Sequence, residues 1–450
     1  MSLKDKASLI FKPSRYKYGK AYSFRGTDFV INRSGNATRT NSSGYIEEVG
    51  TNIPRFDYDP LDLTKCPTLV NERSSTNLVT YSSDMSNSRW QKGAVSVLSN
   101  SAFSPDNTLN ADAVIEDTSS NDHRILTNPP ISATGNQPYS FSLYVKPIGA
   151  PRHIYWMVQS GANAIYCHFD MINIRVNQVT TSGVGSGATA SIVPAANGFY
   201  RIQLSGYPVT SNSDIYNQLY FETESRTGFA AQTYTGDGVS GFYVYGWQVE
   251  NIAAVTGYIP TVGSTVTRNS DSSRITTLQS SKILSASAGT FMIEIDKRQN
   301  PIFMNQKITF GGSSTNSSLL IDNVGGGVRL RIWNNVTSLA GTITTDSFPE
   351  GTVKYLIKWD GTNTSVFANG KFVGSAAVPS YAYAIYDMYE QTSFSNNNIN
   401  EVMFFPSALN DAECISVTSF NDYKELVDAK GLTWESPTIT NNRLTALKEL

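Results

Sequence analysis

Short segments in which apolar and polar residues alternate dominate this chain and constrain its fold more than any other feature. The clearest segment is YSFSLYVKP at residues 139–147. Similar segments recur over residues 90–259 and 291–405, separated by turn formers such as those of residues 182–188. A period of two is typical of strands that bury one face. Many short strands at this spacing predict antiparallel β-sandwiches.

The strand-like segments form two series, so we expect two domains. Residues 86–268 hold the first and residues 271–420 the second, with a break rich in turn formers between them. Residues 1–85 are polar and contain Pro54 and Pro60, which predicts an irregular segment for attachment. Residues 421–450 form a C-terminal tail. The predicted fold class is all-β: two antiparallel, jelly-roll-like β-sandwich domains with an irregular N-terminal segment and a short C-terminal helix.

Local signals refine this outline in the second half of the chain. Asn369-Gly370 lies between two strand segments and predicts a two-residue hairpin turn. Residues 407–417 predict a helix with Asn410 as N-cap and Glu413 three residues on. The tail has leucines three apart, which favours a short helix whose apolar stripe contacts another subunit: Leu444, Leu447 and Leu450.

Composition excludes several classes of function. The 35 basic and 37 acidic residues give a net charge of −2, which argues against a nucleic-acid surface. The three cysteines are far apart and the three histidines are scattered, so we expect no disulfide framework, metal or cofactor. We find no secretory signal and no apolar run of about 20 residues, and therefore expect no membrane insertion.

Three groups of segments resemble known proteins. Residues 33–60 (RSGNATRTNSSGYIEEVGTNIPRFDYDP), 66–82 (CPTLVNERSSTNLVTYS) and Trp90 resemble a segment recurrent in structural proteins of bacteriophages and prophages, especially of Bacteroidetes phages. The next region looks like a carbohydrate-binding-module jelly roll, in SFSLYVKP, NGFYRIQLS, GFYVYGWQVE and TGYIPTVGSTVTRNSD. The last is similar to a concanavalin-A-like, laminin-G-like sandwich, in GTFMIEID, YLIKWDGTNTSVFANGKFVGS and INEVMFFPSALNDAE.

The resemblance implies a virion structural protein of fibre, appendage or decoration type that is not an enzyme. Its implied partners are other virion proteins, further copies of itself, with a trimer favoured, and a host surface polysaccharide. The implied location is the virion, assembled in the cytoplasm of the bacterial host. Two alternatives remain open: a capsular polysaccharide depolymerase on the virion, and a bacterial surface glycan-binding protein.

Glycan binding and polysaccharide cleavage each suggest candidate site residues. Tyrosines stack on the C–H faces of sugars and polar side chains bind hydroxyls, so we assign glycan binding to Tyr381, Tyr383, Asp387 and Asn397. A depolymerase would use Glu294 and Asp296, which share one strand face. Gln299 stands where similar sandwich glycanases have a third acidic residue, and an amide cannot act as the general acid. We therefore assign no catalytic residue.

Other conspicuous residues receive a structural interpretation. Four tryptophans lie within strand patterns and are predicted to pack in the cores: Trp156, Trp247, Trp333 and Trp359. Trp90 and Trp434 are predicted to anchor the segments at the domain edges. His168 alternates with Tyr166 and is predicted to be a sheet residue rather than a base. Residues 325–327 and 360–363 are predicted to be turns.

Overall fold

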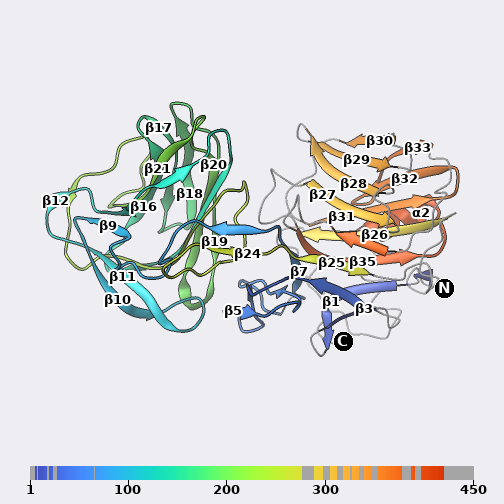
Figure 1. The fold of residues 1–450 in the computed structure, drawn as a ribbon, viewed down its shortest axis with the longest axis horizontal. Coiled ribbons are helices and arrows are strands. Elements are labelled where there is room, and N and C mark those ends of the chain that lie inside the picture. Colours follow the sequence, from blue (N-terminus) through green and yellow to red (C-terminus); the bar gives the residue numbers. More distant parts are fainter. Residues whose placement is uncertain are drawn as a thin grey trace. The chain divides into compact units, whose positions relative to one another are not determined.

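The computed structural model of the chain describes residues 6–7, 9–17, 20–23, 28–64, 66–275, 288–296, 305–311, 318–324, 327–333, 339–345, 352–377, 387–390 and 397–419. In these residues strands predominate and their pairing is antiparallel, which confirms the all-β prediction. The chain forms two compact units, and each unit combines separate stretches of the sequence (Figure 1). Unit 1 combines Met1–Asn36, Val49–Ser74 and Asn269–Leu450, and unit 2 combines Ala37–Glu48 and Ser75–Arg268.

Unit 2 contains two large antiparallel sheets. The six-stranded sheet has the order β10 (Val95–Phe103), β11 (Leu109–Glu116), β23 (Gly241–Glu250), β15 (Tyr139–Ile148), β20 (Tyr200–Tyr207) and β19 (Ser186–Pro194). The seven-stranded sheet has the order β18 (Arg175–Ser182), β17 (Asn163–Asp170), β16 (His153–Ser160), β21 (Ser213–Glu222), β13 (Arg124–Thr127) and β9 (Trp90–Gly93), with β14 (Ile131–Ala133) also on β21. A 3-10 turn, η1 (Ala196–Gly198), precedes β20. Three short pairs complete the unit: β12 (Ser120–Asn121) with β22 (Tyr234–Thr235), β8 (Ser75–Asn77) with β24 (Val266–Arg268), and β4 (Ala37–Thr40) with β5 (Ile46–Val49).

The core of unit 2 contains side chains from both large sheets. Trp247 of β23 stacks on Trp90 of β9 with ring centroids 4.5 Å apart, and meets Trp156 of β16 edge-on at 6.0 Å. All three indoles are buried, which confirms the core prediction for Trp156 and Trp247. Because aromatic side chains bury large areas, this trio links both sheets at the centre of the core.

A buried amide ties together three segments of the resemblance within unit 2. The side-chain nitrogen of Asn77 donates to the carbonyls of Trp247 and Ile259, at 3.2 and 3.0 Å. Its side-chain oxygen accepts from the backbone nitrogens of Val79 and Val249, at 3.2 and 3.1 Å. All four bonds that an asparagine side chain can make are therefore formed, as burial of a polar group requires.

Unit 1 contains one continuous antiparallel path of strands. Its order is β30 (Leu339–Thr345), β29 (Gly327–Trp333), β28 (Ser318–Val324), β27 (Asn305–Gly311), β34 (Asp387–Glu390), β25 (Ser272–Ile275), β3 (Asp28–Asn32), β2 (Lys20–Ser23), β1 (Leu9–Lys17), β35 (Asn397–Phe405), β26 (Gly289–Asp296), β31 (Thr352–Trp359), β32 (Asn363–Ala368) and β33 (Lys371–Ala377). β7 (Thr68–Asn71) pairs with β35 on one side and with β6 (Phe56–Asp57), and both pairings are antiparallel. The two ends of the path, β30 and β33, lie side by side (Figure 1).

The local predictions for unit 1 are confirmed where the structure describes them. Asn369 and Gly370 join β32 to β33 with φ values of 45° and 76°, the left-handed region that a tight hairpin turn needs. Helix α2 (Asp411–Thr418) begins after Asn410, which forms a capping box with Glu413. Its Cys414 packs with apolar side chains of β26, β31 and β35, so the helix covers one face of these strands.

Four charged side chains form a buried ion network in unit 1, called the ion knot here. Asp271 accepts from Arg33 Nη1 at 2.8 Å and also pairs with Arg55. Arg55 Nη1 binds Glu72 Oε2 at 2.7 Å, and Glu72 N donates to Asp271 Oδ2 at 2.9 Å. Arg33 Nη2 also donates to the Gly50 carbonyl at 2.6 Å. The two positive and two negative charges of the ion knot balance, and hydrogen bonds to the backbone add to the ion pairs, as a buried ion network requires.

N-terminal residues contribute more strands than their sequence pattern indicated. β1 pairs with β35 through the register Leu9↔Phe404 and with β2, and β3 pairs with β25. β7 pairs with β35 as well. β1, β3 and β7 each have a partner strand that lies more than 200 residues further along the chain, so local alternation alone is a weak guide to them.

Candidate functional site

An aromatic cluster lies on the outer face of three neighbouring strands, β17, β16 and β21, of the seven-stranded sheet of unit 2. Strand alternation sends Ile154, Trp156 and Val158 of β16 into the core and the side chains between them outward. We call the outward side chains of β16, β17 and β21 the tyrosine face: Tyr155, Met157, Gln159, Ala164, Tyr166, His168, Tyr216, Gln218, Tyr220 and Glu222. The middle of this face is a second, smaller apolar cluster, distinct from the main core.

The rings of the tyrosine face pack around Tyr155. The Tyr155 ring lies parallel to His168 at 4.3 Å between centroids, and stacks on Tyr220 at 5.5 Å. Tyr166 meets it edge-on at 5.8 Å. Burial raises the pKa of Tyr155 and of Tyr220 above the ordinary value for tyrosine, so both hydroxyls stay protonated at physiological pH. The Arg124 guanidinium lies 5.6 Å above the Tyr220 ring.

The tyrosine face has a covered part and an open part. Tyr155, Tyr166 and Tyr220 are at most 6% exposed. Tyr216, four residues before Tyr220 on the same side of β21, is 41% exposed, and it pairs across the strands with the half-buried Gln159. Ring and amide side chains are thus open to solvent at one end of the face.

Residues 223–240, called the strap here, connect β21 to β23 and cover the other end. Phe229 of the strap packs against Tyr166 at 5.3 Å between centroids, and Ala231 packs against the same cluster. The Gly228 backbone bonds on both sides: its nitrogen donates to Gln178 Oε1 at 2.7 Å, and its carbonyl lies 2.8 Å from His168 Nε2. The strap is therefore fastened to the sheet mainly by polar contacts.

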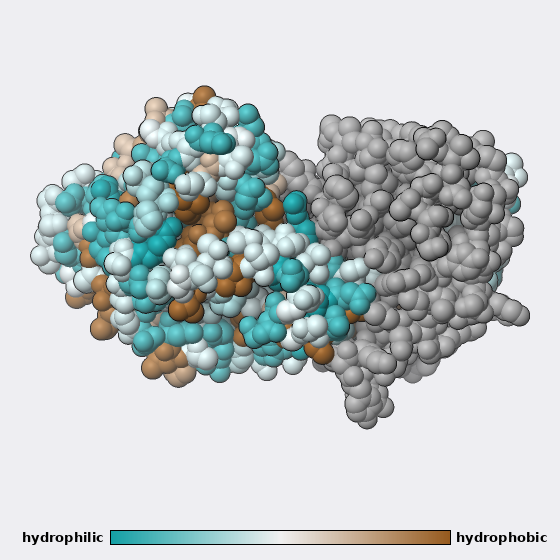
Figure 2. Space-filling model, in the orientation of Figure 1, coloured by the Kyte–Doolittle hydropathy of each residue, from teal (hydrophilic) through white to brown (hydrophobic). Residues whose placement is uncertain are grey.

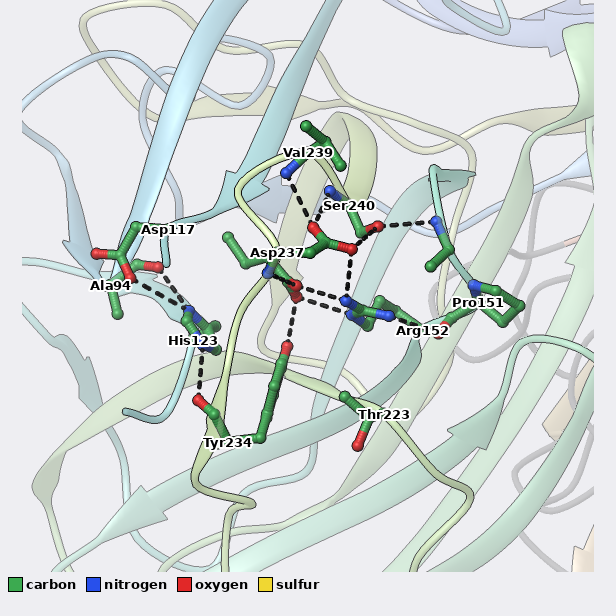
Figure 3. Close-up of polar contacts among 12 residues, drawn as sticks. Ala94, Asp117, His123, Pro151, Arg152, Thr223, Tyr234, Asp237, Val239 and Ser240 are labelled. Carbon is green, nitrogen blue, oxygen red and sulfur yellow. Dashed lines mark hydrogen bonds and ion pairs between the residues drawn. The ribbon is translucent and has the colours of Figure 1, made fainter. Parts of the chain in front are cut away.

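The C-terminal part of the strap closes over a second polar cluster (Figure 3). Glu116 of β11 is fully buried and accepts from Arg152 Nε at 2.8 Å, from the Tyr234 hydroxyl at 2.6 Å and from Asp237 N at 2.8 Å. Arg152 Nη2 also binds Asp237 Oδ2 at 2.9 Å. The hydrogen bond to Glu116 raises the pKa of Arg152, so the guanidinium stays charged. Burial opposes ionisation of Asp237, but hydrogen bonds from Ser240 and the neighbouring backbone outweigh it and lower its pKa.

Hydrophobic residues are exposed elsewhere on unit 2 as well. Figure 2 shows them in separate patches among hydrophilic and neutral residues. Leu98 and Phe103 of β10 are 67% and 57% exposed, as is Leu109 of β11 at 54%. These residues belong to the other sheet, so Phe103 is a useful reference for the exposed Tyr216.

The glycan-binding residues that the sequence suggested lie in unit 1, at positions that the structure describes only in part. Tyr381 and Tyr383 lie outside the described residues. Asp387 begins β34 and Asn397 begins β35, where Asn397 pairs with Asn71, and both side chains lie outside the description. The three tail leucines and Trp434 lie outside it too: Leu444, Leu447 and Leu450.

The suggested carboxylate pair lies on β26. Glu294 is 9% exposed, stands opposite Lys354 and Glu401 in the two neighbouring strands, and accepts from Asn400 Nδ2 at 3.2 Å. Asp296 ends the strand, and its side chain lies outside the description. His168 is a buried residue of strand β17, as predicted.

The sequence analysis missed the tyrosine face, although a signal for it was present. Tyr155, Tyr166 and Tyr220 each alternate with inward apolar residues, so their strands have an aromatic outer face as well as an apolar inner face. Alternation alone does not show that three separate strands bring these rings together.

The described residues lack two kinds of feature that would suggest other functions. Among them, no three or more His, Cys, Asp and Glu side chains are grouped so as to hold a metal ion. No helix in this part of the chain is long and apolar enough to cross a membrane.

Comparison with known proteins finds only distant similarity. No protein family matches the chain, and no curated protein does. Among solved structures, the Ruminococcus gnavus IT-sialidase CBM40 is 17% identical over 30% of this chain and 84% of its own, with a TM-score of 0.24. Domain 4 of a GH43 extracellular arabinanase from Geobacillus stearothermophilus, in complex with arabinotriose, is 12% identical over 38% and 84%, with a TM-score of 0.27. Domains LG4-5 of the mouse laminin alpha1 chain are 11% identical over 64% and 85%, with a TM-score of 0.20. Similarities this low carry no conclusion about this chain.

Proposed function

We propose that this chain is a bacteriophage virion structural protein of fibre, appendage or decoration type, and that the tyrosine face of unit 2 binds a neutral glycan on the host surface. In this proposal the protein is assembled in the host cytoplasm, acts in the virion beside other virion proteins, and has no catalytic role. The observation that carries the glycan part is the second aromatic layer on a sheet that already buries its inner face.

A sheet in a sandwich needs only one apolar face for its stability. The inner face of the seven-stranded sheet fills the core with residues such as Trp156 and Leu219. The outer face carries a further set of rings, including Tyr155, Tyr166 and Tyr220. Rings in excess of the needs of the core favour a recognition role.

The chemistry of the open part matches a neutral sugar. A sugar ring offers C–H faces that pack on aromatic rings, and hydroxyls that bond to amides. The exposed Tyr216 ring and the half-buried Gln159 amide offer both kinds of contact on paired positions of neighbouring strands. The chain has only 16% charged residues, so recognition through uncharged groups also agrees with its composition.

The glycan proposal is tested with the purified full chain on an array of host surface polysaccharides, at low and at high salt. Tyr216→Ala should abolish binding, because the exposed ring supplies the stacking surface. Phe103→Ala removes a similarly exposed ring from the other sheet and should leave binding unchanged. Binding that collapses as salt rises, or that survives Tyr216→Ala, would contradict the proposal.

The virion part of the proposal rests on the resemblance of residues 33–60 and 66–82 to structural proteins of phages. Arg33, Arg55 and Glu72 come from the phage-like segments and join Asp271 in the ion knot. Asn77 of the same segments forms the buried amide contacts of unit 2. Side chains of these segments therefore form buried polar contacts in both units. Mass spectrometry of purified phage particles tests the assignment, and absence of the chain from the particles would refute it.

A structural role without catalysis agrees with the surroundings of Glu294. A depolymerase needs carboxylates that a polysaccharide can reach, whereas Glu294 is 9% exposed and flanked by Lys354 and Glu401. Glu294→Gln and Asp296→Asn should leave virion assembly unchanged. Release of reducing ends from host polysaccharide by the wild type, and its loss in either variant, would favour the depolymerase instead.

The proposed assembly is a homo-oligomer, with a trimer favoured by the resemblance to fibre proteins. The tail leucines supply the proposed contact: Leu444, Leu447 and Leu450. A stripe this short cannot hold a helix alone and needs a further surface. Light scattering that shows only monomer at micromolar concentration would overturn this part.

A further inference from the structure

An exposed carboxylate lies at the open end of the tyrosine face. Asp214 comes two residues before Tyr216 on β21, and Ile215 between them is buried in the main core of unit 2. Residues two apart on a strand point to the same side of the sheet, with Cα atoms about 6.8 Å apart. Asp214 therefore stands beside the Tyr216 ring on the outer face, and both side chains are open to solvent.

A neighbouring strand orients this carboxylate. Ser132 of β14 is the cross-strand partner of Asp214, and its hydroxyl donates to Asp214 Oδ1 at 2.8 Å. Within the part of the chain that the structure describes, Asp214 Oδ2 accepts no hydrogen bond, and no Lys, Arg or His forms an ion pair with this carboxylate. One oxygen is thus held by Ser132, and the other is available to a ligand.

Asp214 lies at the rim of the sheet on the side of β16. The pairing of β16 with β21 runs from His153↔Glu222 to Gln159↔Tyr216, so it ends two residues short of Asp214. No residue of β16 is paired with Asp214. A ligand that packs on the exposed Tyr216 ring can therefore reach the carboxylate from this side.

The polar groups next to Asp214 are available as well. Among the described residues, neither the Gln159 amide nor the Tyr216 hydroxyl has a hydrogen-bond partner. On the covered part of the face, by contrast, the Gln218 amide oxygen already accepts from the Tyr220 hydroxyl at 2.9 Å. We call Gln159, Asp214 and Tyr216 the open corner. It offers a ring, an amide that donates and accepts, and a carboxylate oxygen that only accepts.

We propose that Asp214 determines which glycans the tyrosine face binds. Its available oxygen accepts hydrogen bonds from the hydroxyls of a neutral sugar that packs on Tyr216, and its charge disfavours acidic sugars such as uronic acids. This inference rests on the proposed function and names the residue that sets its specificity.

The chemistry of the two classes of sugar supports this selection. A hydroxyl that donates to a carboxylate forms a charge-assisted hydrogen bond, which is stronger than a bond between neutral groups. The carboxylate of an acidic sugar has no proton to donate and carries the same charge as Asp214, and like charges placed side by side oppose binding. The open corner therefore favours a sugar whose polar groups are hydroxyls.

Two arginines of the same sheet region leave the charge of Asp214 in place. Arg89, which precedes β9, donates to the Pro129 carbonyl. Arg124 of β13 binds Asp122 at 2.7 Å and lies over the Tyr220 ring, on the covered part of the face. Neither forms an ion pair with Asp214, so an acidic sugar in the open corner meets an uncompensated negative charge.

Matched neutral and acidic glycans test the proposal with the purified full chain. Each polysaccharide of the array that contains uronic acids is printed beside its carboxyl-reduced form, in which a primary hydroxyl replaces the carboxylate. At low salt the wild type should bind the reduced form a few times more tightly, because repulsion between exposed charges is modest. This preference should shrink at high salt, because salt screens the repulsion.

Asp214→Asn is the decisive variant. The amide keeps an oxygen that can accept from Ser132, but it removes the charge and puts an NH₂ group in place of the available oxygen. A hydrogen bond to a charged group corresponds to a factor of roughly 10 to 150 in affinity, and exposed groups lie near the lower end. Affinity for the reduced glycan should therefore fall by about tenfold, and the preference over the acidic form should disappear.

Asp117→Asn is the matched control. Asp117 also accepts from a serine hydroxyl, that of Ser119 at 2.6 Å, and its side chain is 48% exposed. It follows β11 and does not belong to the strands of the open corner. This variant should keep the affinity and the preference of the wild type.

The outcomes separate this inference from the proposed function. If the wild type binds through Tyr216 but Asp214→Asn keeps both the affinity and the preference, the role of Asp214 is refuted and the proposed function stands. A wild type that binds acidic and reduced forms equally at low salt, or an Asp117→Asn chain that loses binding as Asp214→Asn does, also overturns the inference. If the wild type binds no glycan, the proposed function and the role of Asp214 fail together.

Discussion

Removing the shared carboxylate of the ion knot is the sharpest test of what holds unit 1 together. In Asp271→Asn an amide of almost the same size replaces the carboxylate. The wild-type knot balances Arg33 and Arg55 against Glu72 and Asp271, whereas the variant keeps one buried positive charge without compensation. In the wild-type knot, burial opposes the charge of Arg55, but Asp271 and Glu72 outweigh it and raise the pKa of its guanidinium, which is therefore charged.

The expected cost follows from this imbalance. Breaking a buried pair by removing one partner destabilises a protein by about 3–5 kcal/mol. A domain is stable by about 5–15 kcal/mol in total, so unit 1 should lose a large fraction of its stability. Native-state hydrogen exchange of β26 and β31 measures this directly. Their slowest amides should exchange roughly 140 to 3,700 times faster, at a factor of ten per about 1.4 kcal/mol.

Asp411→Asn is the matched control within the same unit. Asp411 pairs with Lys358, but its side chain is 68% exposed. Exposed pairs contribute about 1 kcal/mol or less, so exchange should quicken only a few-fold. If Asp271→Asn has no larger effect than Asp411→Asn, the reasoning about the ion knot is wrong.

Three further outcomes are expected. Asn410→Ala removes the N-cap of α2 and should cost unit 1 about 1 kcal/mol in urea unfolding, and an unchanged midpoint would contradict the cap assignment. In the native protein a thiol reagent should modify Cys66 alone, because Cys66 is exposed and the other two cysteines are buried. Burial raises the pKa of Cys167 well above the ordinary value and the pKa of Cys414 to about 12. A second label in the intact mass would refute this. Burial opposes ionisation of Asp170, but its hydrogen bonds outweigh this and lower its pKa to about 2. The ionised carboxylate therefore contributes fully to the free energy of unfolding above about pH 4, and this contribution is lost as the pH falls towards 2. Melting curves over that range should therefore fall less steeply for Asp170→Asn than for the wild type.

Features fixed by neighbouring residues could be predicted from the sequence. The hairpin at Asn369 and Gly370 needs two residues that tolerate positive φ, and the helix after Asn410 needs a capping side chain. Both signals act over a few residues, and both predictions are confirmed. The pairing of β1 with β35 joins Leu9 to Phe404, which lie far apart in the sequence, so no local pattern specifies it.

The candidate site was harder to predict because its residues come together only in the folded sheet. The sequence pointed to Tyr381 and Tyr383, a run of tyrosines close together along the chain. The structure assembles Tyr155, Tyr166 and Tyr220 from three strands, through the registers Tyr155↔Tyr220 and Met157↔Tyr166. Register depends on pairing across the sheet, which composition and spacing do not contain.

The segments that resemble phage proteins form buried contacts within the fold, whereas the tyrosine face is the proposed surface for glycan recognition. Arg33, Arg55, Glu72 and Asp271 use their charges on one another, and Asn77 uses its whole amide on backbone groups, so these residues have little capacity left for a ligand. The tyrosine face lies on β16, β17 and β21, outside every segment that carries the resemblance. The resemblance therefore describes how the chain is built, and in the proposed function the choice of glycan belongs to side chains that can change without disturbing either buried network.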